Sequence, residues 1–131
     1  MKAKLVAALM FTFALLSNAQ AEDELGYKGK NSDGLSPEAL LLKLESDGET
    51  EIREERNWVV ATSNKLRTIW SFPPKSHPAY PSYVKREVIE KDGTIFMETS
   101  VRCGAEKSQC DELVKDFIEL NAKVHNEINS K

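Results

Sequence analysis

The chain has 131 residues, which is enough for one domain with a single modest core. It carries 18 Lys and Arg residues against 21 Asp and Glu residues, so its formal net charge is −3. This balance argues against a nucleic-acid partner, because phosphates are bound by clustered Lys and Arg side chains. His77 and His125 are far apart and lack the spacing of metal ligands, so we expect neither a metal site nor a cofactor.

The N-terminus has the three regions of a secretory signal peptide. Lys2 and Lys4 precede a mainly apolar run over residues 5–16, and the small residues Ala19 and Ala21 form a cleavage site. The run has 12 residues, whereas a membrane span needs about 20, so we expect cleavage rather than a stable membrane anchor. The predicted organisation is a signal peptide over 1–21, a flexible polar tether over 22–35 and one small domain over 36–131.

Cys103 and Cys110 are the only cysteines in the chain. Export would place them in an oxidising compartment, the periplasm or the exterior, where an even cysteine count most simply means a disulfide. The six residues between them differ from the C-x-x-C spacing of thiol redox pairs. We therefore expect one structural disulfide bond.

A helix is expected at each end of the domain. Ser36 is suited to cap the first helix, with Pro37 at its first position. The second helix lies at the C-terminal end of the domain, with Ser108 as its expected N-cap. Its apolar residues recur at spacings of three and four, the pattern of a helix with one buried face. These residues are Leu113, Phe117, Leu120, Val124 and Ile128.

Between the helices, apolar residues alternate with a period of two, which indicates strands. Ile52, Trp58 and Val60 fall on one side of a single extended segment, and a turn is expected over residues 63–65. The residues expected to share a face of the next strand are Leu66, Thr68, Trp70 and Phe72.

Asp92-Gly93 separates two β-rich runs over 82–91 and 94–102, which predicts a hairpin with a two-residue type I′ turn. Counting back from the turn gives the cross-strand pairs. On one face they are Val88 with Met97, Arg86 with Thr99 and Val84 with Val101; on the other they are Ile89 with Phe96, Glu87 with Glu98 and Tyr83 with Arg102. The expected fold is α+β, an antiparallel sheet of about four strands with an N-terminal and a C-terminal helix packed on it.

Four of the five prolines fall within residues 70–83. Each proline fixes φ and lacks an amide donor, so this segment should be a stiff, polyproline-like connection that presents aromatic rings for binding. The alternative is a sheet crossover whose rings cover the rim of the core. The candidate binding residues of this segment are Trp70, Phe72, His77, Tyr80 and Tyr83.

Arg86 is a sixth candidate binding residue. The inferred register places it on the sheet face that the C-terminal helix should cover, where an unpaired guanidinium is costly. It could reach the sheet edge or pair with a carboxylate such as Glu90 or Asp116. The functional alternative is a ligand anion that meets both Arg86 and His77. No nucleophile motif is present in the sequence, so no catalytic residue is assigned.

Several of these features together resemble a group of small uncharacterised exported proteins of Gram-negative bacteria. The resemblance covers residues 66–121 and implies a periplasmic location without an enzymatic role. It is carried by Trp70-Ser71-Phe72, His77-Pro78-Ala79-Tyr80-Pro81, Val84-Lys85-Arg86, Asp92-Gly93 and the two cysteines.

The sequence thus favours an exported, noncatalytic binding or accessory module. Such a module would contact another cell-envelope protein, for example as an inhibitor or immunity factor. The alternative is a small periplasmic enzyme, such as a hydrolase, with an unrecognised site near His77 and Arg86. A deep pocket that gathers these two residues with a carboxylate would favour the enzyme.

Mass spectrometry of the protein isolated from its host tests the export prediction. We expect an N-terminus at Glu22 and no free thiol. An intact Met1 together with two free thiols would contradict it.

Overall fold

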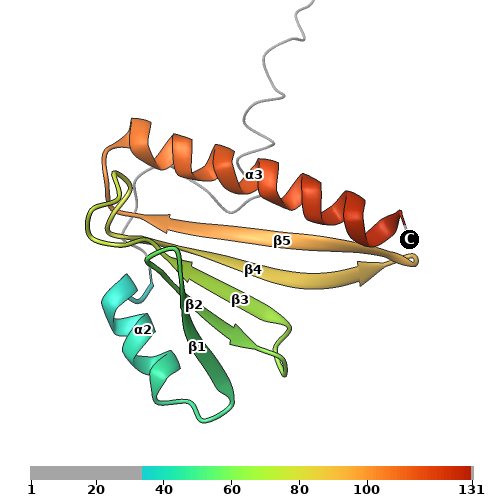
Figure 1. The fold of residues 1–131 in the computed structure, drawn as a ribbon, viewed down its shortest axis with the longest axis horizontal. Helices are drawn as coiled ribbons and strands as arrows, with labels where there is room; N and C mark the ends of the chain where they lie inside the picture. Colours follow the sequence, from blue (N-terminus) through green and yellow to red (C-terminus); the bar gives the residue numbers. More distant parts are fainter. Residues whose placement is uncertain (1–33, 131) are drawn as a thin grey trace, which may run out of the picture.

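The structure is a computed structural model that describes residues 34–130. One antiparallel sheet, with the strand order β1-β2-β3-β4-β5, lies between two helices (Figure 1). The elements in chain order are α2 (Pro37–Glu45), β1 (Thr50–Glu55), β2 (Trp58–Ser63), β3 (Thr68–Phe72), β4 (Ser82–Lys91), β5 (Thr94–Cys103) and α3 (Lys107–Asn129). The expected signal peptide and most of the expected tether lie outside the described residues.

The α+β fold class is confirmed, but the sheet has five strands rather than about four. The extra strand comes from the segment that the sequence predicts to be continuous. Arg56 and Asn57 adopt positive φ values of 52° and 72° and form a two-residue turn that pairs Glu55 with Trp58. The turn contains no glycine, so the usual signal for such a hairpin is missing.

The same turn corrects the predicted face of Ile52. Ile52 pairs with Ala61, so it lies on the opposite face of the sheet from Trp58 and Val60. There it packs in the cluster around Leu44 of α2. The prediction that Ile52, Trp58 and Val60 share one side is therefore wrong.

The β4–β5 hairpin matches the register predicted from its turn at every predicted pair. Asp92 and Gly93 have φ values of 53° and 80°, as a type I′ turn requires. The register places Val84, Arg86 and Thr99 on the face that α3 covers.

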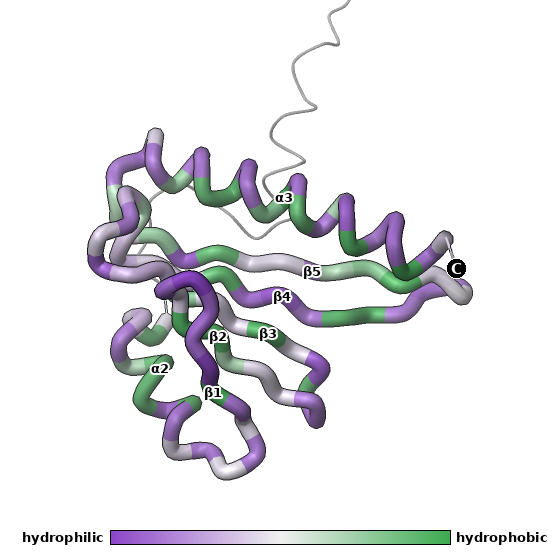
Figure 2. Tube along the Cα trace, in the orientation of Figure 1, coloured by the Kyte–Doolittle hydropathy of each residue, from purple (hydrophilic) through white to green (hydrophobic). Residues whose placement is uncertain are grey.

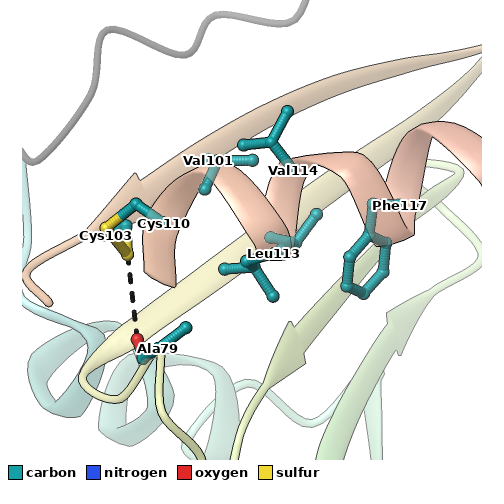
Figure 3. Packing of buried hydrophobic residues seen from close by; sticks show 8 residues of the cluster. Ala79, Val101, Cys103, Cys110, Leu113, Val114 and Phe117 are labelled. Carbon is teal, nitrogen blue, oxygen red and sulfur yellow. Dashed lines mark hydrogen bonds between the residues drawn. A yellow bond between two sulfur atoms is a disulfide. The ribbon is translucent and has the colours of Figure 1, made fainter. Parts of the chain in front are cut away.

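The two helices pack on opposite faces of the sheet. Helix α2 begins after Ser36, whose Oγ accepts a hydrogen bond from the Ala39 amide at 3.1 Å, and it covers a cluster that includes Trp70 and Phe72. Helix α3 lies along β5, and Figure 2 shows its apolar stretches on the side turned toward the strands. The α3 cluster consists of Ala79, Val84, Val101, Cys103, Cys110, Leu113, Val114 and Phe117 (Figure 3).

Helix α3 is the predicted C-terminal helix, with two differences. It begins at Lys107 after Glu106, two residues before the first position that an N-cap at Ser108 would give. Its buried stripe ends at Phe117, because Leu120 is 39% exposed and Ile128 is 42% exposed. The apolar pattern of α3 therefore extends past its last buried residue.

The far end of α3 is tied to the start of β5 by polar contacts. The Nδ2 atom of Asn129 donates to the carbonyl oxygen of Ile95 at 3.1 Å, and Nδ1 of His125 lies 3.0 Å from the same oxygen. The His125 ring also stacks on Phe96, with 5.4 Å between the ring centroids. Within residues 34–130, no helix combines the length and the apolar character that crossing a bilayer requires.

The predicted disulfide is present between Cys103, the last residue of β5, and Cys110 in the first turns of α3. Both cysteines are fully buried, and Cys103 Sγ lies 3.8 Å from the carbonyl oxygen of Ala79 (Figure 3). The bond therefore fixes where α3 starts relative to the sheet.

Replacing Cys103 and Cys110 together by alanine should lower the free energy of unfolding by about 2.5 kcal/mol, because the unfolded chain regains the entropy of the short loop. Urea denaturation followed by circular dichroism measures this loss. The unsubstituted protein in reducing buffer is the control and should shift in the same direction. An unchanged midpoint in both samples would show that the bond does not stabilise the fold.

Candidate functional site

The connection between β3 and β4 is compact rather than extended. The amide of His77 donates to the Pro74 carbonyl at 2.9 Å, and the amide of Tyr80 donates to the His77 carbonyl at 3.0 Å. These bonds close two successive turns, because His77 and Tyr80 have the amide donors that the four prolines lack. The segment is therefore folded into turns and is not the extended, polyproline-like connection that the sequence predicts.

The candidate aromatic residues divide between the core and the surface. Trp70 and Phe72 are 6% and 5% exposed and belong to the core cluster under α2. Tyr83 packs beside them, with 5.8 Å between the centroids of the Phe72 and Tyr83 rings. Tyr80 is 41% exposed, so it is the candidate ring most available to a partner.

A groove with a volume of about 650 Å³ lies between the start of α2 and the proline segment; we call it the proline groove. Its walls are mostly apolar and include both Tyr80 and the edge of the buried Phe72. The lining residues are Ser36, Pro37, Glu38, Leu41, Val59, Phe72, Pro73, Pro74, Lys75, Tyr80, Pro81, Ser82 and Arg102.

His77 is oriented away from this groove, into a row of aromatic contacts on the α3 side of the sheet. Its Nδ1 accepts a hydrogen bond from the Ala79 amide at 3.0 Å, and its ring meets Trp58 edge-on at a centroid distance of 5.2 Å. The centroids of the Trp58 and Phe117 rings are 5.9 Å apart, and the Arg86 guanidinium lies 5.2 Å from the Phe117 centroid. Two rings thus stand between His77 and Arg86 in this row.

A second groove of about 390 Å³ lies on the α3 side, where α3 leaves part of the sheet uncovered; we call it the arginine groove. It combines three arginines and one carboxylate with apolar side chains. The lining residues are Arg53, Glu55, Arg56, Trp58, Val60, Ile69, Ser71, Arg86, Phe117 and Leu120.

Arg86 is on the face predicted for it and is only 9% exposed. Its Nε–H has no hydrogen-bond acceptor among the described residues, and neither Glu90 nor Asp116 pairs with it. Burial lowers the pKa of the Arg86 guanidinium, and the charge of Glu55 acts in the opposite direction. An unsatisfied buried donor costs about 1–3 kcal/mol, and contact of the guanidinium with the Phe117 ring opposes that cost.

Among residues 34–130, neither of the two grooves gathers His77, Arg86 and a carboxylate together. Arg86 and Glu55 line the arginine groove, but His77 lines neither this groove nor the proline groove. Arg53, Arg56 and Trp58 were not predicted as site residues, because the sequence does not reveal the β1–β2 hairpin that brings them together. Residues 34–130 contain no group of three His, Cys, Asp or Glu side chains placed to hold a metal ion.

Comparisons of the chain with protein-family models, curated proteins and solved structures give no match. The function must therefore be inferred from the geometry of the two grooves.

Arg86→Ala should lower the free energy of unfolding by more than about 1 kcal/mol, because it removes a long buried stem from the contact with Phe117 and leaves a void. Lys85→Ala is the matched control, since Lys85 directly precedes Arg86 in β4 and pairs with Trp70 on the opposite face. Thermal unfolding measures both variants. Equal melting temperatures for Arg86→Ala and the unsubstituted protein would contradict the packing role.

Proposed function

We propose that this protein is an exported, noncatalytic binding module that contacts another protein of the cell envelope through the proline groove. The observation that carries the proposal is a concave, mostly apolar surface built from conformationally restricted parts. Inhibition or immunity toward the bound protein is the kind of role that such a module serves.

Preorganisation of the groove supports a role in binding. Four of its lining residues are prolines, whose φ angles are fixed before any partner arrives: Pro37, Pro73, Pro74 and Pro81. Gly104 of the segment after β5 donates its amide to the Pro81 carbonyl at 2.9 Å, which holds the end of the proline segment against the sheet. Little conformational entropy is therefore lost when a partner docks, and exposed Tyr80 supplies the ring most suited to a hot spot.

The charges of the groove indicate the chemistry of the partner. Lys75 and Arg102 contribute two positive charges to the lining and Glu38 contributes one negative charge. Neither histidine nor cysteine lines the groove among the described residues, so it offers no imidazole or thiol there. A partner segment with an apolar side chain next to a carboxylate that reaches Lys75 would suit this lining.

The compartment is supported by two independent features. A fully buried disulfide joins β5 to α3, and such bonds form and persist in oxidising surroundings. The signal-peptide pattern over residues 1–21 is consistent with export to the periplasm.

Photo-crosslinking at the groove tests the proposal. A photoreactive phenylalanine analogue in place of Tyr80 should give a discrete crosslinked protein in periplasmic extract, identified by its mass. The same analogue in place of Phe96 is the matched control, because Phe96 is also an exposed ring, 39% exposed, and does not line the groove.

Affinity for the crosslinked protein then tests the contribution of the ring. Tyr80→Ala should weaken binding by about tenfold or more, the effect of removing an interface hot spot, whereas Phe96→Ala should not. Equal crosslinking from both positions, or full binding by Tyr80→Ala, would rule out the proline groove as the interface.

A further inference from the structure

The arginine groove is separate from the proline groove, and a ligand bound there is independent of the function proposed for the proline groove. Neighbouring residues of a strand point to opposite faces, so Trp70 and Phe72 lie toward α2 while Ser71 lies toward α3. Arg86 pairs with Ile69 and shares the α3 face with Ser71. The two grooves therefore present different chemistry on the two sides of one sheet.

Positive charge is concentrated in the arginine groove although the chain as a whole is acidic. Arg53, Arg56 and Arg86 line it, against the single carboxylate of Glu55. Arg53 already contacts two carboxylates, those of Glu51 at 3.9 Å and Glu55 at 3.5 Å, and both pairs are exposed to solvent. Arg86 differs from Arg53 because its guanidinium has no carboxylate within 4 Å among residues 34–130.

The most buried charged group of the groove is a donor that lacks an acceptor among residues 34–130. Arg86 is 9% exposed, its Nε–H is buried without a hydrogen bond, and its guanidinium lies against the face of the Phe117 ring. A guanidinium presents its N–H groups in a planar fork that matches the two oxygens of a carboxylate. An incoming carboxylate would give this buried donor its missing acceptor.

The rest of the lining is suited to hydrocarbon. Trp58 is half-buried, Ile69 is partly exposed and Leu120 is 39% exposed, so their apolar surfaces are available beside the guanidinium. Transfer of a hydrocarbon body onto these surfaces is favourable because it removes apolar area from water on both sides. A small inorganic anion would leave this part of the groove unused.

We propose that the arginine groove binds a small amphiphilic carboxylate, with the carboxylate on Arg86 and the hydrocarbon body against Trp58, Ile69 and Leu120. A free fatty acid and the apolar C-terminal residue of a short peptide both carry this chemistry.

Titration of the purified full chain with octanoate tests the proposal. Calorimetry should show saturable binding, and the NMR signal of the Arg86 Nε–H should shift as the proton gains an acceptor. Acetate, which lacks the chain, and 1-octanol, which lacks the charge, should each bind about tenfold or more weakly than octanoate.

Substitutions assign the binding to this groove. Arg86→Met should weaken octanoate binding by about tenfold or more, because it keeps an apolar stem but removes the guanidinium. Lys85→Met is the matched control, since it removes the same charge from the other face of β4 and should bind octanoate normally. Leu120→Glu, at an exposed position of the lining, provides a second test if Arg86→Met does not fold, and it should also lose binding by charge repulsion.

The proposal is overturned if octanoate does not bind, if 1-octanol or acetate binds equally well, or if Arg86→Met or Leu120→Glu folds and binds octanoate unchanged. Acetyl-Leu-Phe with a free carboxylate, compared with its amide, distinguishes the two ligand sources. Tighter binding of this peptide acid than of octanoate would support a peptide C-terminus, and the reverse order would support a fatty acid.

Discussion

The ten-residue ladder between β4 and β5 determines which side chains face α3 and which face the opposite side of the sheet. A slip of one residue would move Val84 and Arg86 to the other face, because side chains alternate along a strand. The type I′ turn at Asp92-Gly93 prevents that slip at one end of the ladder. At the other end, the disulfide from Cys103 fixes the start of α3 over the same two strands.

Both grooves exist because the sheet is wider than the single helix that packs on each of its faces. Strands lie about 4.8 Å apart and a helix is about 10 Å across, so one helix covers only two or three of five strands. Helix α3 packs along β5, and the part of this sheet face that α3 leaves uncovered becomes the arginine groove. Helix α2 lies on the other face (Figure 1). The proline groove forms where its first turn meets the β3–β4 connection.

The two grooves differ in how their surfaces are held in place. Proline rings and short turns fix one wall of the proline groove locally, whereas its other walls come from α2, Val59 of β2 and Arg102 of β5. The arginine groove is assembled from β1, β2, β3, β4 and α3, and the Arg86 guanidinium is held there by its contact with Phe117. A buried cation without a protein acceptor costs stability, which separates this groove from ordinary core packing.

Features that depend on local chemistry could be predicted from the amino-acid order alone. The Asp92-Gly93 turn with its ladder, the Ser36 cap, the helical spacing from Leu113 to Phe117 and the single cysteine pair all follow from short-range rules. Which apolar side chains are buried depends instead on the packing of the whole domain. That packing placed Trp70 and Phe72 in the core and left Leu120 exposed, because local periodicity reports one apolar face and cannot report what covers it.

The β1–β2 turn also could not be predicted from the local sequence. Arg56 and Asn57 carry no glycine signal, so their positive φ values arise from the pairing of the strands that flank them. That pairing creates the fifth strand, carries Ile52 to the α2 face and brings Arg53 and Trp58 beside Arg86. The arginine groove was therefore hidden from sequence reasoning, since its members meet only through contacts between residues far apart in the chain.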